Sequence, residues 1–212
     1  MKNILITGST SGIGKEIAEV LSKKNNVFLT GRRELNKANF YSCDLSNVQD
    51  VEKLYQKACE YFETDVDILI NCAGQYIYKP IDEMSFEEIE NLININFKSA
   101  YLLSKLVIPS MKKNNWGRII NIGSISGVVG EANASLYSAT KSAFFGFSKA
   151  LALELAQNNI TINTINPGWV DTPLADNSLN EDEKQEIIEI VPQKRFISPN
   201  EIAKLCEFLI SN

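Results

Sequence analysis

The N-terminal stretch Ile4-Leu-Ile-Thr-Gly-Ser-Thr-Ser-Gly-Ile-Gly14 decides the fold class of this 212-residue chain. It joins an apolar run, typical of a buried strand, to a helical pattern through a glycine-rich turn. The same alternation of strand and helix continues to the end of the chain. Strand patterns cover residues 4–7, 27–30, 40–43, 66–71, 118–122 and 160–166. Helical patterns cover residues 13–23, 46–62, 85–113 and 136–158, and a last stretch begins at 201.

This alternation predicts a single α/β domain over residues 1–212, with a Rossmann-like doubly wound parallel sheet and helices on both faces. We expect six strands in the sheet. Capping boxes at 46–49 and 85–88, and Ser198 before Pro199, predict three helix starts. A break is expected in the long helical pattern near 94–96, and the acidic segment 180–189 is expected to be a solvated helix face.

Composition and charge exclude several classes of protein. Apolar residues make up 44% of the chain and charged residues 22%, as in an ordinary globular protein. The net charge of −5 argues against a general nucleic-acid binder. No apolar run approaches the ~20 residues of a membrane-spanning helix, and the first strand begins too early for a signal peptide. We therefore expect a cytoplasmic protein without nucleic-acid or membrane partners.

The histidine and cysteine content restricts the possible chemistry further. The chain has no histidine, which excludes a Ser-His-Asp hydrolase and every histidine-ligated metal site. Its cysteines lack the spacing of a zinc site, so we expect free thiols and no metal. They are Cys43, Cys59, Cys72 and Cys206. Acid–base chemistry must then come from tyrosine, lysine, cysteine or carboxylate groups.

The glycines of the first turn form a candidate phosphate-binding loop. Gly8 allows a tight turn, Gly12 lets the backbone approach a diphosphate, and Gly14 permits close packing of helix and strand. The free N–H groups and the dipole at the helix N-terminus favour a negative charge. The alternative is a glycine-rich turn without a ligand. The spacing is GxxxGxG rather than the commoner GxGxxG.

Three motifs together resemble those of the classical short-chain dehydrogenases and reductases. They are TGxxxGxG at Thr7–Gly14, Asn71-Cys-Ala-Gly74 and Tyr137-Ser-Ala-Thr-Lys141. The resemblance extends from Lys2 to about Leu209. The sequences at 117–120 and 146–149 are similar to those of bacterial 3-oxoacyl-carrier-protein reductases. It implies an oxidoreductase that moves a hydride between a nicotinamide dinucleotide and a carbonyl or alcohol.

The resemblance also implies a catalytic set. Its members are Asn96, Ser124, Tyr137 and Lys141. Ser124 would donate a hydrogen bond to the substrate oxygen, and Tyr137 would donate or accept its proton. Lys141, one helical turn from Tyr137, would lower the pKa of the phenol and bind the nicotinamide ribose. Asn96 would hold a water of a proton relay. Asn94 and Ser126 remain alternatives to Asn96 and Ser124.

Cofactor contacts follow from the same resemblance. In the first turn they are Gly8, Ser9, Thr10, Ser11, Gly12, Ile13 and Gly14. Asp44 and Leu45 would border the adenine, and Asn71, Ala73 and Gly74 would follow the fourth strand. The residues that would contact the nicotinamide and its ribose are Tyr137, Lys141, Pro167, Gly168, Val170 and Thr172.

The end of the second strand bears on which dinucleotide is bound. An NAD site usually has Asp or Glu there, whereas residues 29–33 read Leu-Thr-Gly-Arg-Arg. A guanidinium group suits a 2′-phosphate, which a carboxylate would repel. We therefore favour NADP(H) over NAD(H), with Arg32 as the main contact and Arg33 in support. The alternative is that both arginines are solvated turn residues.

Two features depart from the family pattern. The segment between Arg33 and Phe40 is too short for the usual helix, and the chain stops at Asn212, before the usual seventh strand. The missing strand puts tetramerisation in doubt. We expect a homodimer through the helix that carries Tyr137. A stripe of small residues there, which could instead pack internally, comprises Ala139, Ala143, Gly146 and Ala150.

The substrate stays open beyond a small carbonyl or alcohol compound. Residues 174–195 are expected to form a mobile lid, but their few large apolar side chains and several acids define no ligand. A non-catalytic NADP(H)-binding sensor or scaffold is the alternative function, and the complete catalytic set argues against it. An epimerase or dehydratase of the extended relatives would usually have GxxGxxG and a longer C-terminal domain.

Overall fold

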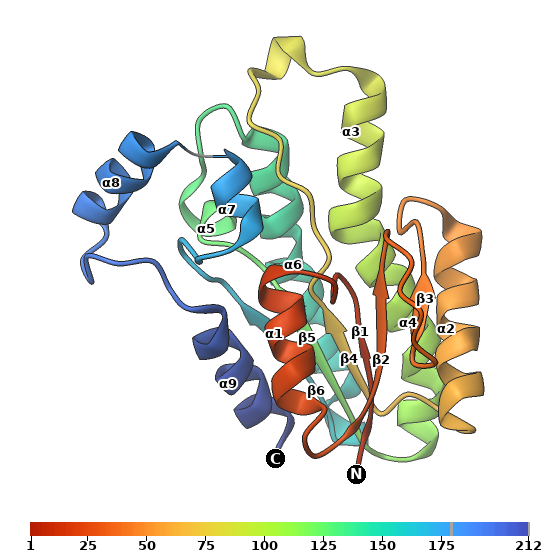
Figure 1. Ribbon diagram of the computed structural model, residues 1–212. Helices are drawn as coiled ribbons and strands as arrows, with labels where there is room; N and C mark the ends of the chain where they lie inside the picture. The colour runs from red at the N-terminus through yellow and green to blue at the C-terminus, as the bar shows by residue number, and fades with distance from the viewer. Residues whose placement is uncertain (179, 212) are drawn as a thin grey trace.

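A computed structural model describes residues 1–178 and 180–211; Leu179, inside the expected lid, and Asn212 lie outside the described residues. Six parallel strands form one sheet in the order β3-β2-β1-β4-β5-β6 (Figure 1). They are β1 (Asn3–Ile6), β2 (Asn26–Gly31), β3 (Phe40–Ser42), β4 (Ile68–Asn71), β5 (Gly117–Ile122) and β6 (Ile160–Ile165). This is the strand order of the Rossmann fold, so the predicted fold class is confirmed. Residues 1–178 and 180–211 form no seventh strand.

Helices cover both faces of the sheet. The α-helices are α1 (Gly12–Leu21), α2 (Val48–Phe62), α3 (Phe86–Ile93), α4 (Ser99–Lys113), α5 (Ser126–Val129), α6 (Ser135–Leu155), α7 (Pro173–Ser178), α8 (Glu181–Ile190) and α9 (Pro199–Ile210). Short 3₁₀ turns lie at η1 (Ile81–Glu83) and η3 (Ala156–Asn158). In Figure 1, α1 and α9 lie side by side on one face, whereas α2, α4 and α6 cover the other.

Alternation along the strands divides the core into two layers. Ile4 and Ile6 of β1 pack with the buried residues of α1 and α9, whereas Leu5 packs with those of α2 and α4. Every residue of β1, β4 and β5 is buried, as expected for central parallel strands covered on both faces. Side chains that follow these strands stand at the carboxyl rim of the sheet, where open α/β sheets bind ligands.

Local signals predicted most helix starts correctly. Capping boxes are present at Ser85 and Ser198, with Pro199 in the first turn of α9. The box predicted at 46–49 is wrong. Asn47 caps α2 by accepting hydrogen bonds from the N–H groups of residues 49 and 50, and the Ser46 hydroxyl donates to Asp44 instead. The predicted break is a π-helical turn, η2 (Asn94–Lys98), between α3 and α4.

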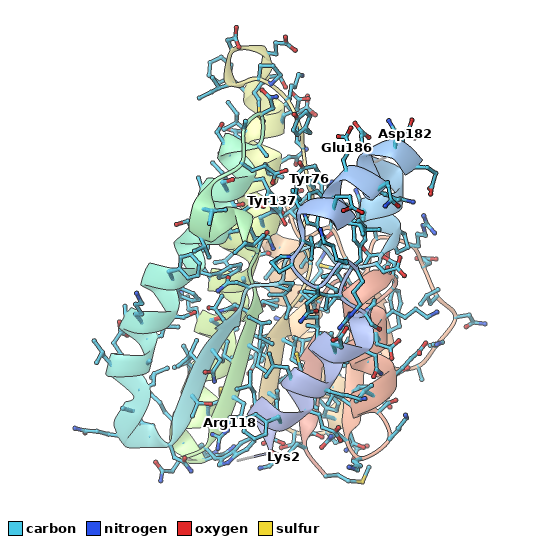
Figure 2. All side chains as sticks on the ribbon, turned by 90° about the vertical axis from the view of Figure 1, so that its left-hand side faces the viewer. Lys2, Tyr76, Arg118, Tyr137, Asp182 and Glu186 are labelled. Carbon is cyan, nitrogen blue, oxygen red and sulfur yellow. The ribbon has the colours of Figure 1, made fainter. Side chains whose placement is uncertain are left out.

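The described part of the expected lid consists of α7, α8 and the turn before α9. An Asn180 capping box starts α8, whose side chains are mostly exposed. Figure 1 shows α8 standing away from the sheet, and Figure 2 shows Asp182 and Glu186 on its outer side. The solvated acidic helix is therefore confirmed. Of the helices in the described residues, none has the length and apolarity to cross a bilayer.

Candidate active site

The predicted catalytic residues meet at the carboxyl end of β5. Ser124 lies two residues beyond the end of this strand. Tyr137 and Lys141 lie in the first turns of α6, and Asn96 lies in the π turn η2. Ser124 and Tyr137 line a cavity of about 280 Å³. Carboxyl ends of parallel strands are where open α/β sheets bind ligands.

Lys141 is buried against the ring of Tyr137. Its side-chain nitrogen lies 5.7 Å from the ring centre and donates a 2.8 Å hydrogen bond to the carbonyl oxygen of Ile122. A Cβ at Gly74 would lie 3.3 Å from this nitrogen, so the missing side chain at Gly74 leaves room for the lysine. Burial lowers the pKa of Lys141 to about 8, against 10.5 for an ordinary lysine.

The pKa of Tyr137 moves in the direction opposite to the expected one. Burial raises it, and the negative charge of Glu131 adds to the increase, while a hydrogen bond with Ser124 opposes both. The expected lowering by Lys141 is absent, because the lysine contacts the ring and the Ile122 carbonyl group instead of the hydroxyl. Tyr137 is therefore a protonated phenol at neutral pH.

Ser124 heads a chain of hydrogen bonds that ends on a carboxylate. Its hydroxyl donates to Ser126 Oγ at 3.2 Å, and Ser126 Oγ donates to Glu131 Oε2 at 2.8 Å. The hydroxyl of Tyr76 donates to Glu131 Oε1 at 2.6 Å. The Tyr76 ring meets the Tyr137 ring edge-on with centres 5.0 Å apart, as Figure 2 shows for the two labelled tyrosines.

Tyr76 and Glu131 are site residues that the sequence did not reveal. Glu131 lies between Ser124 and Tyr137 in the chain, and this position could have marked it as a site residue. A single acidic residue in a loop, however, belongs to no recognisable motif. Tyr76 comes from the segment after β4, and only the fold brings it to α6. Ser126, considered as an alternative to Ser124, instead accepts the Ser124 hydrogen bond.

Asn96 is 1% exposed, and its side chain makes three hydrogen bonds. Its Oδ1 accepts from the Gln75 N–H group at 2.7 Å, and its Nδ2 donates to the Gln75 carbonyl oxygen at 2.9 Å and to Thr140 Oγ1 at 3.3 Å. π turns inside helices often occur at functional sites. Here the turn directs Asn96 toward the segment beside Lys141, whereas Asn94 is only partly buried.

The glycine-rich turn fits a diphosphate. Gly8 and Gly12 have positive φ angles of 66° and 52°, which L side chains rarely adopt. A Cβ at Gly14 would collide with the Gly8 carbonyl oxygen, which explains the close packing of α1. Ser11 caps α1 without a side-chain hydrogen bond, so its side chain leaves the first N–H groups to a ligand.

Two hydroxyl groups of the turn hydrogen-bond to the protein backbone and not to a ligand. The Ser9 hydroxyl and N–H group both pair with the Thr30 backbone and join the turn to β2. Thr7 Oγ1 accepts hydrogen bonds from the N–H groups of Cys72 and Ala73, which joins β1 to the loop after β4. Among the predicted contacts, the side chain of Ser9 and the N–H group of Ala73 are thus already paired.

The predicted adenine end of the site is open. Arg32 and Arg33 are exposed directly after β2, where a Cβ at Gly31 would collide with the Thr10 side chain, so the first turn and the arginines lie side by side. Neither guanidinium group has an ion-pair partner within residues 1–178 and 180–211. Asp44 Oδ1 accepts two hydrogen bonds from Ser46.

The predicted nicotinamide segment closes the other side of the cavity. Pro167, Gly168, Val170 and Thr172 all line it, together with Ile13 of the first turn. A Cβ at Gly12 would lie 3.2 Å from the Thr172 methyl group, so this segment packs over the glycine-rich turn. The Asn71 side chain points to β5 and donates to Asn121 Oδ1 at 2.8 Å, while its own Oδ1 is buried without a partner.

Fold and site together define an α/β oxidoreductase with a dinucleotide-binding turn beside a Ser–Tyr–Lys cluster. The profile of the short chain dehydrogenase family matches residues 2–184. The chain is 35% identical to a D-beta-hydroxybutyrate dehydrogenase of Cupriavidus necator, covering 99% of this chain and 91% of the relative. It is 38% identical to a 3-oxoacyl-[acyl-carrier-protein] reductase of Buchnera aphidicola, covering 99% and 90%. It is 37% identical to the reductase of that name from Haemophilus influenzae, covering 100% and 91%. The chain belongs to the short-chain dehydrogenase family.

Proposed function

We propose that this chain is an NADP(H)-dependent oxidoreductase that interconverts a carbonyl and an alcohol, with Tyr137 as general acid and base. The observation that carries the proposal is the cavity at the carboxyl end of β5. Ser124 and Tyr137 share its wall, Lys141 is buried against the Tyr137 ring, and the segment from Pro167 to Thr172 closes the opposite side.

The roles of the side chains follow from their positions and ionisation. A bound nicotinamide ring supplies or accepts the hydride. In the reducing direction the Tyr137 hydroxyl donates its proton to the substrate oxygen. The Ser124 hydroxyl turns from Ser126 to donate a hydrogen bond to the same oxygen. Lys141 binds the nicotinamide ribose. Its positive charge, 5.7 Å from the centre of the Tyr137 ring, favours the phenolate less than a direct hydrogen bond to the hydroxyl would. Asn96 holds a water of the proton relay through the segment at Gln75.

The preference for NADP(H) rests on the end of β2. Residues 29–33 contain no carboxylate that could accept a hydrogen bond from a ribose 2′-hydroxyl, and Arg32 and Arg33 are exposed beside the first turn. Arginine forms paired, charge-assisted hydrogen bonds with phosphate groups. Arg32 is therefore proposed to bind the 2′-phosphate, with Arg33 in support.

The substrate is proposed to be a small carbonyl or alcohol compound, covered by the lid at 174–195 of a single domain. The relatives are named for two different substrates, a D-beta-hydroxybutyrate and a 3-oxoacyl group on a carrier protein. The segments whose sequence is similar to that of the reductases, 117–120 and 146–149, lie in β5 and α6, away from the substrate cavity. They therefore do not choose between these substrates.

A homodimer through α6 is part of the proposal. Three residues of the small-residue stripe, Ala139, Gly146 and Ala150, are exposed, and Ala143 is partly buried. A Cβ at Gly146 would meet open space. Nearby, Leu153 is 84% exposed. Light scattering of the wild type and of Gly146→Arg tests it, because a long charged side chain on this face should produce monomers.

Fluorescence titration with NADPH and NADH, followed by a ketone-reduction screen, tests the function. We expect tighter binding of NADPH, and Tyr137→Phe should keep that binding but lose turnover by about 10²–10⁴-fold. Tyr61→Phe, on the surface of α2, is the matched control and should change neither. Turnover that survives in Tyr137→Phe would refute the acid–base role. NADPH binding without turnover of any ketone would favour the sensor or scaffold.

A further inference from the structure

Glu131 places a fixed negative charge in the wall of the cavity. Of the described residues that line the cavity, it is the one Asp, Glu, Lys or Arg. Lys141 is buried beside the Tyr137 ring and does not line the cavity. A substrate bound next to Ser124 and Tyr137 therefore meets a carboxylate, and among the described residues that line the cavity there is no lysine or arginine.

The carboxylate is held in place by two short hydrogen bonds. Tyr76 donates to Oε1 at 2.6 Å and Ser126 donates to Oε2 at 2.8 Å. Both donors line the same cavity, and Glu131 is partly buried between them. Since each oxygen has a second lone pair, Glu131 can still accept a hydrogen bond from a substrate, but it has no proton to donate as a carboxylate.

The other walls of the cavity are apolar or uncharged. Val129, Trp169 and Leu174 supply apolar surface. Helix α8, which follows α7 of the cavity wall in the chain, carries five acidic residues and one lysine. Neither the wall nor this helix offers the guanidinium or ammonium cluster by which proteins bind small carboxylates.

We propose that Glu131 makes this site selective for uncharged carbonyl compounds and excludes those with a carboxylate close to the reacting carbon. The inference rests on the proposed function, because it assumes that the reacting carbonyl binds at Ser124 and Tyr137. Two like charges in a half-buried cavity repel each other far more than in water. This exclusion is a form of specificity that acts through repulsion of the wrong substrate.

Acetoacetate and methyl acetoacetate form the test pair, because they share the reacting ketone and differ in charge. The measured quantity is the ratio of kcat/KM for the ester to kcat/KM for the acid, with NADPH as reductant. The ester is also the better electrophile, so the change of this ratio between variants decides the question. In Glu131→Gln, which has the same shape without the charge, the ratio should fall at least about tenfold, mainly through faster reduction of the acid.

Ser126→Ala is the matched control. It removes the hydrogen bond to Glu131 Oε2 but keeps the charge, so the ratio should stay within about twofold of the wild type. A ratio that falls equally in both variants would show that the hydrogen-bond network, and not the charge, sets the preference. A wild type that prefers the acid, or a ratio unchanged in Glu131→Gln, would overturn the proposal.

A binding measurement covers the case in which both ketones are reduced too slowly to compare. Butyramide should quench the fluorescence of the NADPH-loaded wild type, butyrate should not, and Glu131→Gln should bind both. Butyrate binding by the wild type as tight as that of butyramide would overturn the proposal. Failure of the proposed function has different signatures, namely no dinucleotide binding or turnover that persists in Tyr137→Phe.

Discussion

The side-chain nitrogen of Lys141 donates a 2.8 Å hydrogen bond to the carbonyl oxygen of Ile122, the last residue of β5. This bond joins the helix that carries Tyr137 to the strand that leads into Ser124. Since Lys141 is 4% exposed, the bond is made by a group that has lost nearly all of its water. The position of the tyrosine relative to the serine thus depends on a buried lysine whose protonation changes with pH.

The first prediction concerns stability in Lys141→Met. The pKa of Lys141 is about 8 in the folded protein and near 10.5 in the unfolded chain, so between these values the unfolded chain binds more protons. The free energy of unfolding should therefore rise with pH across this window, by on the order of 3 kcal/mol from this group. Lys141→Met should lack that part of the rise. Urea denaturation of both proteins at the two ends of the window measures it, and equal pH dependences would contradict it.

The second prediction concerns the direction of the reaction. Because burial raises the pKa of Tyr137 above its ordinary value of 10, the phenol is protonated at neutral pH and ready to act as an acid. Carbonyl reduction should be nearly independent of pH around neutrality. Alcohol oxidation needs the phenolate, so its kcat/KM should increase about tenfold per pH unit from pH ~7 to ~9. An oxidation rate that levels off below pH ~8 would show that Tyr137 is ionised more easily.

The third prediction concerns the dinucleotide. Arg32→Glu should weaken NADPH binding at least about tenfold, because it replaces a charge-assisted hydrogen bond to phosphate by repulsion. NADH binding should change less than about threefold. Lys37→Glu, an exposed residue of the same loop, makes the same change of charge and is the control. Equal losses for NADPH and NADH in Arg32→Glu would mean that Arg32 is not at the 2′-phosphate.

The fourth prediction separates Asn96 from Asn94. Asn96→Ala removes three hydrogen bonds of a buried side chain and leaves the backbone polar groups of Gln75 without their partner. We expect the free energy of unfolding to fall by about 2–3 kcal/mol. Asn94 makes no side-chain hydrogen bond within the described part of the chain, so Asn94→Ala should cost less than about 1 kcal/mol. Urea denaturation measures both, and similar losses would contradict the assignment.

Much of the fold could be predicted because its signals are local. Apolar runs, glycines and capping residues act through the backbone within one or two turns, so the strands and most helix starts were found in the right places. The capping box at 46–49 was wrong because Ser46 and Asn47 are both good caps, and Ser46 bonds to Asp44 instead. Which of the two residues caps the helix depends on the path of the backbone after β3, and a motif defined by residue spacing carries no information about that path.

The sequence by itself determined the order of strands and helices, the glycine-rich turn, and the presence of Asn96, Ser124, Tyr137 and Lys141 on elements that end at one rim of the sheet. Only the tertiary structure decided how these groups are ionised, because burial and neighbouring charges set a pKa. Burial, with the charge of Glu131, raised the pKa of Tyr137 against the expected direction, while Lys141 bonds to Ile122 instead of the hydroxyl. The tertiary structure also brought Tyr76 to Glu131, 55 residues further along the chain. Contacts between such distant residues arise from the packing of strands and helices, and so they have no signal in the local sequence.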